Sequence, residues 1–419
     1  MIKSKKKIVI SGYYGFNNCG DEAVLLAIVH CLKRLDPGLR IMVFSNDPRK
    51  TRETYGVEAV CRWNPVSMAL QLISCGLLIS GGGSLIQDVT SSRNARYYLG
   101  VIRAALLFRK KVMIFSQGVG PLNAERNRVK TRKAFSRCNV ITVRDKFSAD
   151  LIKELGVTGD VQIVSDPVMA LRPEDFGVDS ISDLLRSSGM PDGSGAPDGS
   201  GAPDGSGAPD GSGAPDGSDE PRKPLLLTAV RSWNDNSHIA PVAALLDLQV
   251  ERGWDVLLVP AHFPSDLEAV RELKRLMAST PFAIENCLTA SQFVALTSRA
   301  DKVVSMRLHG LICAMAMGTP ALGLSYDPKV DGFMEQAGLE RYCLPYDGFD
   351  LETAKELLEE LDGTSETGDG SLSGALQPGG SGMEPAARQR TVPCQSSRRE
   401  EMRVSAWEAA RKAVDLMQK

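Results

Sequence analysis

One short motif in the second half of the chain, Met306-Arg307-Leu308-His309-Gly310, places an arginine and a histidine two residues apart. The apolar run 302–305 before it predicts a buried strand, and the apolar run 311–317 after it predicts a helix. The motif therefore lies where a strand ends and a helix begins, which is where open α/β domains bind small anions. Arginine can hold a phosphate or carboxylate through two hydrogen bonds, and histidine can transfer a proton near neutral pH. We predict an anion-handling active site at Arg307 and His309; a buried histidine beside a structural ion pair is the alternative.

Three glycine-rich turns follow predicted strands in the first half of the chain. Glycine allows the backbone to approach a ligand closely, and the N–H groups of such turns can hold anions or sugar hydroxyls. The spacing of the first turn matches neither a dinucleotide-binding fingerprint nor a P-loop. A tight turn in which Asp21 caps a helix explains that turn equally well. The candidate ligand-binding residues of the three turns are Gly15, Asp21, Gly82, Gly83, Ser84, Asp88, Gln117 and Gly118.

Charged residues also occupy predicted strand ends. Any one of them alone is expected to form a salt bridge or a helix cap. Together with Arg307, the cations Arg144, Arg231 and Lys329 could surround an anionic substrate. Asp166, like Asp21 and Asp88, could orient sugar hydroxyls or act as a base. No group of potential metal ligands has tight spacing, so we predict neither a metal site nor a cofactor.

The composition restricts the class of protein. The chain has 419 residues, of which 43% are hydrophobic and 24% charged, enough for two ordinary domains. A net charge of −2 argues against nucleic acid as a partner. No apolar run reaches the roughly 18 residues of a membrane span, and the basic N-terminus leads into a short strand rather than a signal peptide. The nine cysteines form no C-x-x-C pair, which indicates buried thiols in a cytoplasmic protein without disulfides or zinc.

Short apolar stretches alternate with helical patterns along most of the chain, which predicts parallel sheets covered on both faces. We predict an α/β fold of two doubly wound Rossmann-like domains facing a cleft, at residues 1–189 and 222–362. Strands are expected at 7–11, 40–44, 77–80, 112–116, 140–144, 161–165, 225–230, 255–259 and 302–305.

Two segments have compositions that cannot bury a core. Residues 190–221 repeat Gly-Ala-Pro-Asp-Gly-Ser with a period of six, which predicts a linker, and residues 363–397 are a low-complexity segment. Beyond them, apolar residues recur at helical spacing, so residues 398–419 are predicted to form an amphipathic helix that packs on a domain.

Residues 126–137 predict a basic helix, which follows a second basic run at 109–111. A solvated surface is the simpler interpretation of this helix. Attraction to an anionic membrane leaflet or to a diphosphate-linked lipid is the other, and it would make the protein peripheral at the inner face of the cell membrane.

These motifs, in their order and spacing, resemble the polysaccharide pyruvyltransferase family, specifically the bacterial branch that acts on secondary cell-wall polymers anchoring S-layer proteins. The resemblance covers nearly the whole chain. It includes the three glycine-rich turns, Val143-Arg144-Asp145, Asp166-Pro167 and the motif around His309. The hexapeptide repeat and the low-complexity segment depart from the family pattern.

The resemblance implies a GT-B-like fold and a reaction with phosphoenolpyruvate as co-substrate. The N-terminal domain would hold the acceptor, a β-linked N-acetylmannosamine on a lipid diphosphate, and the C-terminal domain the phosphoenolpyruvate. The product would be a 4,6-linked pyruvate ketal, with phosphate released. His309 would be the general acid–base, Arg307 and Lys329 would hold the phosphate, and Arg144 and Arg231 the carboxylate. The alternatives are a GT-B glycosyltransferase or nucleotide-sugar enzyme, and a non-catalytic carbohydrate-binding protein.

Overall fold

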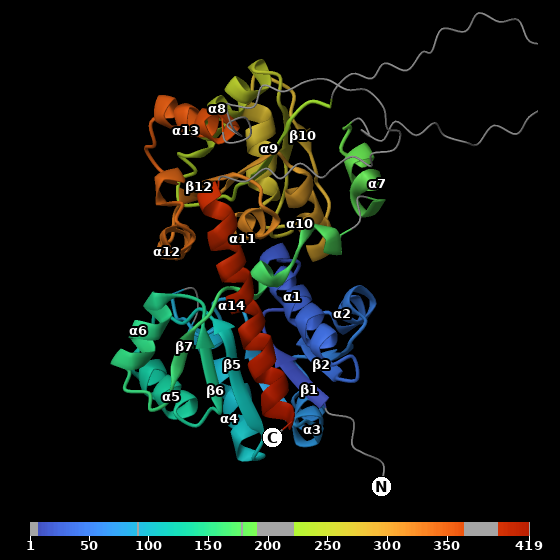
Figure 1. Ribbon diagram of the computed structural model, residues 1–419, viewed down its shortest axis with the longest axis vertical. Coiled ribbons are helices and arrows are strands. Elements are labelled where there is room, and N and C mark those ends of the chain that lie inside the picture. The colour runs from blue at the N-terminus through green and yellow to red at the C-terminus, as the bar shows by residue number, and fades with distance from the viewer. Residues whose placement is uncertain (1–6, 90–91, 177–178, 191–221, 364–392, 419) are drawn as a thin grey trace, which may run out of the picture.

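A computed structural model of the protein describes residues 7–89, 92–176, 179–190, 222–363 and 393–418. The predicted linker and low-complexity segment lie almost entirely outside these ranges. The described residues form two α/β domains stacked along the long axis of the molecule (Figure 1). The predicted fold class, two doubly wound Rossmann-like domains, is confirmed.

The N-terminal domain contains a seven-stranded parallel sheet in the order β3-β2-β1-β4-β5-β6-β7. The central strands β1 and β4 are buried along their whole length, because a parallel sheet covered on both faces needs strands that are apolar on both sides. The sequence pattern did not predict β3, which is short and only partly buried. The strands are β1 (Lys7–Ser11), β2 (Arg40–Ser45), β3 (Glu58–Cys61), β4 (Leu77–Gly81), β5 (Lys111–Gln117), β6 (Val140–Val143) and β7 (Val161–Ile163).

Helices cover both faces of this sheet. α1 packs on one face, and α3, α4, α5 and α6 pack on the other. The cap of α1 is Asn18, whose side chain accepts a hydrogen bond from the N–H of Gly20; the alternative role of Asp21 as a helix cap is therefore wrong. The helices are α1 (Cys19–Leu35), α2 (Pro48–Tyr55), α3 (Pro65–Ser74), α4 (Ser92–Leu107), α5 (Glu125–Phe135) and α6 (Lys146–Glu154).

The C-terminal domain repeats the architecture with a six-stranded parallel sheet in the order β10-β9-β8-β11-β12-β13. Its strands are β8 (Leu225–Ala229), β9 (Asp255–Leu258), β10 (Phe282–Ala283), β11 (Lys302–Ser305), β12 (Ala321–Ser325) and β13 (Cys343–Pro345). Its helices are α8 (Ile239–Glu251), α9 (Leu267–Leu276), α10 (Ala290–Arg299), α11 (Leu308–Met317), α12 (Pro328–Ala337) and α13 (Leu351–Gly363).

Two helices link the domains. Helix α7 (Asp179–Ser187), which follows the short 3-10 turns at Pro167–Ala170 and Pro173–Asp175, packs against α10 although it lies within the predicted N-terminal unit. Helix α14 (Pro393–Gln418) starts beside the C-terminal domain and ends against the N-terminal sheet (Figure 1). Near its end, the carbonyl of Leu416 accepts a hydrogen bond from Lys111 Nζ at 2.9 Å. This long contact helps to hold the two sheets in one orientation.

Candidate active site

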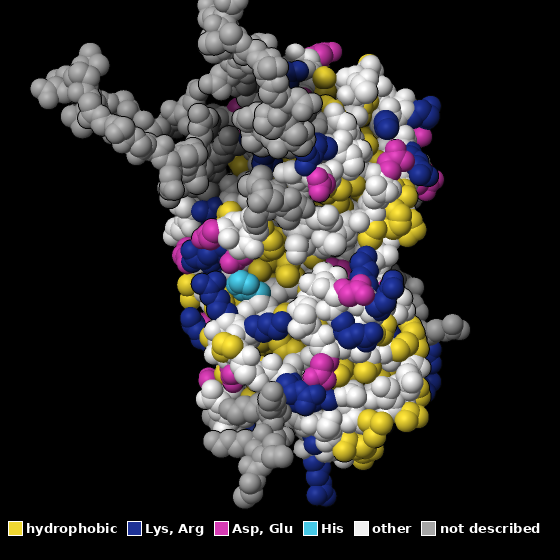
Figure 2. All heavy atoms as spheres, turned by 90° about the vertical axis from the view of Figure 1, so that its right-hand side faces the viewer, with side chains coloured by type: hydrophobic (Ala, Val, Ile, Leu, Met, Phe, Trp, Pro, Cys, Tyr) yellow, Lys and Arg dark blue, Asp and Glu magenta, His cyan; other side chains and the backbone are white. Residues whose placement is uncertain are grey.

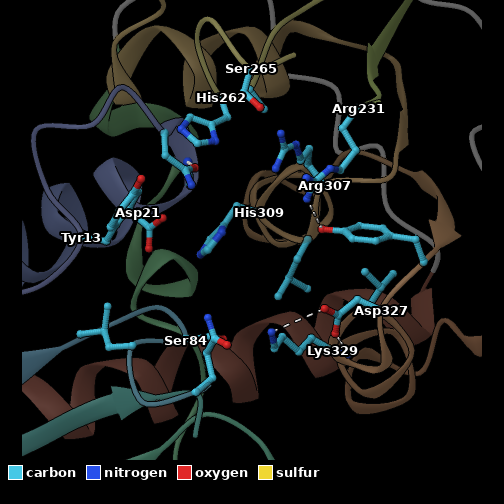
Figure 3. A pocket seen from close by; sticks show the side chains of 18 of the residues that line it. Tyr13, Asp21, Ser84, Arg231, His262, Ser265, Arg307, His309, Asp327 and Lys329 are labelled. Atoms are coloured by element: carbon cyan, nitrogen blue, oxygen red, sulfur yellow. Dashed lines mark hydrogen bonds and ion pairs between the residues drawn. The ribbon is translucent and has the colours of Figure 1, made fainter. Parts of the chain in front are cut away.

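A cleft of about 450 Å³ lies between the two domains. It is lined by residues that follow β1, β4 and β6 of the N-terminal sheet and β8, β9, β11 and β12 of the C-terminal sheet. In each sheet the strand order reverses there, between β1 and β4 and between β8 and β11. A crevice at the carboxyl ends of strands, at such a switch point, is the usual ligand site of an open α/β sheet. Figure 3 shows Tyr13, Asp21 and Ser84 on one side of this cleft, facing Arg231, Arg307 and Lys329 on the other.

His309 stands in the first turn of α11, as the motif predicted. The turn is shaped by Ser305, whose Oγ accepts a hydrogen bond from the N–H of Arg307 at 3.0 Å. Gly310 is required beside it, because a Cβ there would lie 2.3 Å from Ser305 Oγ. The first N–H groups of a helix have no intrahelical partner, so the start of α11 is suited to bind an anion.

The His309 imidazole is largely buried between the domains. Its Nε2 has no hydrogen-bond partner among the described residues and lies 3.8 Å from Oδ2 of Asp166. Burial is the largest influence and, together with Arg144 and Arg307, lowers the pKa of His309 to about 4, against the opposing effect of Asp166. The ring is therefore neutral near pH 7 and can accept a proton.

Asp21 lines the same cleft from the first turn of α1. Burial, followed by the neighbouring carboxylate of Glu22, raises the pKa of Asp21 to about 7, against the opposing effect of Arg144. Asp21 can thus carry a proton near neutral pH. Two groups whose environments move their pKa values in opposite directions are suited to separate acid and base roles.

Arg307 is held by a carboxylate that the sequence did not reveal. Its Nε donates a hydrogen bond to Oδ2 of Asp266 at 2.9 Å, and its Nη2 contacts Oδ1 of the same residue. Asp266 is fully buried and also accepts a hydrogen bond from the N–H of His262. The pair fixes the direction of the Arg307 guanidinium toward the cleft.

Lys329 and Arg231 are held less tightly. Lys329 extends from the start of α12 into the cleft, with its Nζ 3.5 Å from Oδ2 of Asp327 (Figure 3). Arg231 lies over the rings of Trp233 and Tyr326 and donates a hydrogen bond to the Tyr326 hydroxyl at 3.2 Å. Neither contact neutralises the cation as fully as a buried carboxylate would, so both can attract an anionic ligand.

Arg144 belongs to a buried network behind His309. Its Nη1 lies 3.1 Å from Oδ2 of Asp166, and its Nη2 donates a hydrogen bond to Ser84 Oγ at 3.0 Å. Gly118 lies against this network, because a Cβ there would be 2.8 Å from Ser84 Oγ. Arg144 and Ser84 reach the cleft, whereas Asp166 lies behind it.

The remaining predicted residues do not line the cleft. Gly82 and Gly83 allow the turn after β4 to pack on Val24 and Asp21, so their role is to shape the site. Gly15 lies against the turn after β2. Asp88 accepts hydrogen bonds from the N–H groups of Asn123 and Ala124 and stabilises the loop before α5, while Gln117 is fully buried.

Several residues that line the cleft were not predicted from the sequence. Gly20 contacts the His309 ring, and a two-residue bridge pairs Asn18 of the N-terminal domain with His262 of the C-terminal domain. Burial is the largest cause that lowers the pKa of His262. Tyr13, Asn18 and Gly20 could have been found from the sequence, because they belong to the first glycine-rich turn, whereas His262 follows no distinctive pattern. The missed residues that line the cleft are Tyr13, Asn18, Gly20, Leu85, Gln87, Asn94, Tyr98, Ala261, His262, Ser265, Leu308, Tyr326, Asp327 and Val330.

Within the described ranges, no three His, Cys, Asp or Glu side chains converge in a way that could hold a metal ion. Among the helices of the same ranges, none is both long and apolar enough to cross a bilayer.

Solved structures with the same architecture define the fold class. HepE of Anabaena in complex with UDP-glucose matches with a TM-score of 0.57 at 13% identity, over 98% of this chain and 99% of that chain. A glycosyltransferase of Rickettsia africae matches with a TM-score of 0.57 at 11% identity, over 99% of this chain and 98% of that one. The UDP-GlcNAc 2-epimerase of Neisseria meningitidis bound to UDP-GlcNAc matches with a TM-score of 0.54 at 10% identity, over 98% of this chain and 99% of that chain. The fold is thus GT-B-like.

The sequence identifies the family. The family model for polysaccharide pyruvyl transferase matches residues 18–328, a range that includes most of the cleft-lining residues of both domains. Comparison with curated proteins gives no match. The chain belongs to the polysaccharide pyruvyl transferase family.

Proposed function

We propose that this protein transfers the pyruvyl group of phosphoenolpyruvate onto a β-linked N-acetylmannosamine of a lipid-diphosphate-linked cell-wall precursor, forming a 4,6-ketal. Membership of the family supports pyruvyl transfer. The observation that carries the proposal is the cleft itself, where four cations meet a neutral histidine and a protonatable carboxylate. The acceptor sugar and its lipid carrier rest on the resemblance to the S-layer-anchoring branch.

The cations suit a substrate that carries both a phosphate and a carboxylate. Arg307 and Lys329 stand at the starts of α11 and α12, where helix dipoles also favour an anion, and we assign the phosphate to them. Arg231 has no carboxylate partner among the described residues, and we assign the substrate carboxylate to it. Arg144 is engaged with Asp166 and Ser84, so its main role is to position these two residues.

The proton transfers divide between two residues. Protonation of the methylene carbon C3 of phosphoenolpyruvate makes C2 oxocarbenium-like, and Asp21 is the residue whose raised pKa suits this donation. Neutral His309 accepts the proton of the first sugar hydroxyl as its oxygen attacks C2. The second hydroxyl then attacks C2 while the C2–O bond to phosphate breaks. The second hydroxyl's proton leaves with the phosphate, and the proton taken by His309 restores Asp21, so the transfer balances without a further reactant.

Incubation of the full-length protein with phosphoenolpyruvate and a synthetic N-acetylmannosaminyl-N-acetylglucosamine diphosphate lipid tests the proposal. We expect phosphate release together with a product heavier by one pyruvate less one water. His309→Gln should lower the rate by about 10²–10⁴-fold, the usual contribution of a general base, without a change in melting temperature. His30→Gln, at a histidine of α1 that does not line the cleft, is the matched control.

Three outcomes would contradict the proposal. Turnover of a nucleotide sugar but not of phosphoenolpyruvate would indicate a GT-B glycosyltransferase or nucleotide-sugar enzyme. Binding of the acceptor without phosphate release would indicate a carbohydrate-binding protein. Near-normal turnover by His309→Gln would remove His309 from the mechanism.

A further inference from the structure

Helix α3 presents an apolar face to solvent. Val66, Leu70 and Ile73 are 70%, 60% and 52% exposed, and their i, i+4, i+7 spacing places them along one side of the helix. Trp63, two residues before the helix, is 62% exposed. Leu72 packs the other side onto the domain core, and no residue of the helix is charged. In Figure 2, where the side of the molecule that carries α3 faces the viewer, hydrophobic side chains gather low on the N-terminal domain.

Helices α4 and α5 form a basic groove of about 670 Å³ on the same domain. Within the described ranges none of its five cations forms a salt bridge, since the single carboxylate of the groove, Glu125, lies 3.6 Å from Arg128 instead. Partial desolvation and the nearby cations lower the pKa of Lys130. Cations grouped without counter-charges repel one another, so an anionic partner would relieve the repulsion. The five cations are Arg103, Arg126, Lys130, Lys133 and Arg137.

The two features belong to one face of the molecule. Helix α4 packs against both α3 and α5, and all three cover the face of the sheet opposite α1 and α14. An apolar helix surface beside a group of cations is the arrangement by which peripheral proteins bind bilayers, because apolar side chains enter the interface while cations contact lipid phosphates.

We propose that this face of the N-terminal domain docks on an anionic phospholipid bilayer, with the exposed side of α3 in the interface and the α4–α5 cations on lipid phosphates. The charge of the groove disfavours a second copy of the chain as the occupant. A two-fold interface centred on α3 would bring the flanking basic grooves of two copies toward each other. An anionic bilayer provides an apolar interface for the side chains of α3 and phosphates for the cations.

The docking face adjoins the cleft. The ring of Trp63 lies 5.7 Å from that of Tyr97 on α4, and the next residue, Tyr98, lines the cleft. A bilayer at this face would therefore lie close to one side of the cleft, from which a lipid-linked acceptor could enter. The docking itself does not depend on which reaction occurs there.

Vesicle flotation with the full-length protein tests the inference. We expect the protein to float with phosphatidylcholine vesicles that contain phosphatidylglycerol, weakly with pure phosphatidylcholine, and less in high salt because screening weakens the attraction. The double variant Lys130→Glu/Lys133→Glu should lower the partition coefficient on anionic vesicles at least about tenfold, since each surface cation is worth about a factor of five. Leu70→Ser/Ile73→Ser should lower binding to both kinds of vesicle.

The controls alter other surfaces in the same way. Val404→Ser changes a residue of α14 that is 49% exposed, and Arg271→Glu/Lys274→Glu reverses two exposed cations of α9. Both should float like the unaltered protein, and all variants should keep its melting temperature. The inference is overturned if the unaltered protein does not float with anionic vesicles, or if the α9 control loses as much binding as the groove variant. It is also overturned if sedimentation shows a dimer that Leu70→Ser/Ile73→Ser dissociates, without vesicle binding.

Discussion

Gly20 and His309 touch across the domain interface: a Cβ at position 20 would lie 2.3 Å from Nδ1 of the imidazole. The glycine is at the start of α1 and the histidine at the start of α11, so the first turns of two helices from different domains meet at this point. The position of the His309 ring is thus set by the N-terminal domain as well as by its own helix.

Gly20→Ala should displace the imidazole without unfolding the protein. A misplacement of about 1 Å in a catalytic group can cost about 10²-fold in rate, and we expect a fall in kcat of that order. Steady-state phosphate release and the melting temperature measure the two effects. Gly332→Ala is the matched control, because a Cβ there meets nothing within 4 Å. An unchanged kcat in Gly20→Ala would show that catalysis does not depend on the position of the His309 ring against Gly20.

Asp21 should limit activity at alkaline pH. An acid must be protonated to donate, so kcat/KM should decline as pH rises through about 7, where burial places the pKa of Asp21. On the acid side, activity should persist until His309 is protonated, near its pKa of about 4. The pH profile of kcat/KM for phosphoenolpyruvate measures both limbs. Asp21→Asn should have a low kcat/KM that no longer declines at alkaline pH. If the alkaline decline persists in this variant, another group causes it.

The same shift affects stability. The pKa of Asp21 is raised from 3.8 to about 7 on folding, so between these values the folded state binds more protons than the unfolded state. The contribution of Asp21 to the free energy of unfolding is therefore fully present below pH 3.8 and is lost as pH rises through about 7. Asp21→Asn should accordingly raise the melting temperature more at about pH 8 than at about pH 6. An equal effect at both pH values would contradict the raised pKa.

Asp266 should matter for both stability and catalysis. Asp266→Asn leaves the Arg307 guanidinium, whose side chain is only 13% exposed, without its counter-charge. Loss of one partner from a buried ion pair costs about 3–5 kcal/mol, so we expect a lower free energy of unfolding in urea together with a higher KM for phosphoenolpyruvate. Glu285→Gln, which removes the partner of the exposed Arg271, should change neither quantity noticeably. Wild-type stability in Asp266→Asn would show that water replaces the carboxylate.

Lys329 should act on the phosphate. Removal of a cation that stabilises a leaving group usually costs about 10²–10³-fold in kcat, and Lys329→Ala should show a loss of this order. Lys329→Arg should recover part of it, because the charge is retained while the geometry changes. Lys355→Ala, on α13, is the control at a partly exposed lysine outside the cleft. A loss confined to KM, with kcat preserved, would mean that Lys329 binds the substrate without assisting phosphate release.

The sequence by itself determined the two-domain α/β architecture and the strand ends at which Arg144, Arg307 and His309 stand. These features are local, since apolar periodicity marks strands and helices within a few residues. The carboxyl ends of parallel strands share one edge of a sheet, so placing a residue after a strand already places it near the cleft.

Only the tertiary structure decided which of those residues line the cleft and what charge they carry. Asp88 follows a strand as Ser84 does, yet it binds the backbone of a loop while Ser84 reaches the cleft. The contact of Gly20 with His309 joins positions that are far apart in the sequence. The low pKa of His309 and the high pKa of Asp21 arise mainly from desolvation, which depends on how both domains exclude water. Packing between segments that are far apart in the chain cannot be predicted from the local sequence pattern of either segment.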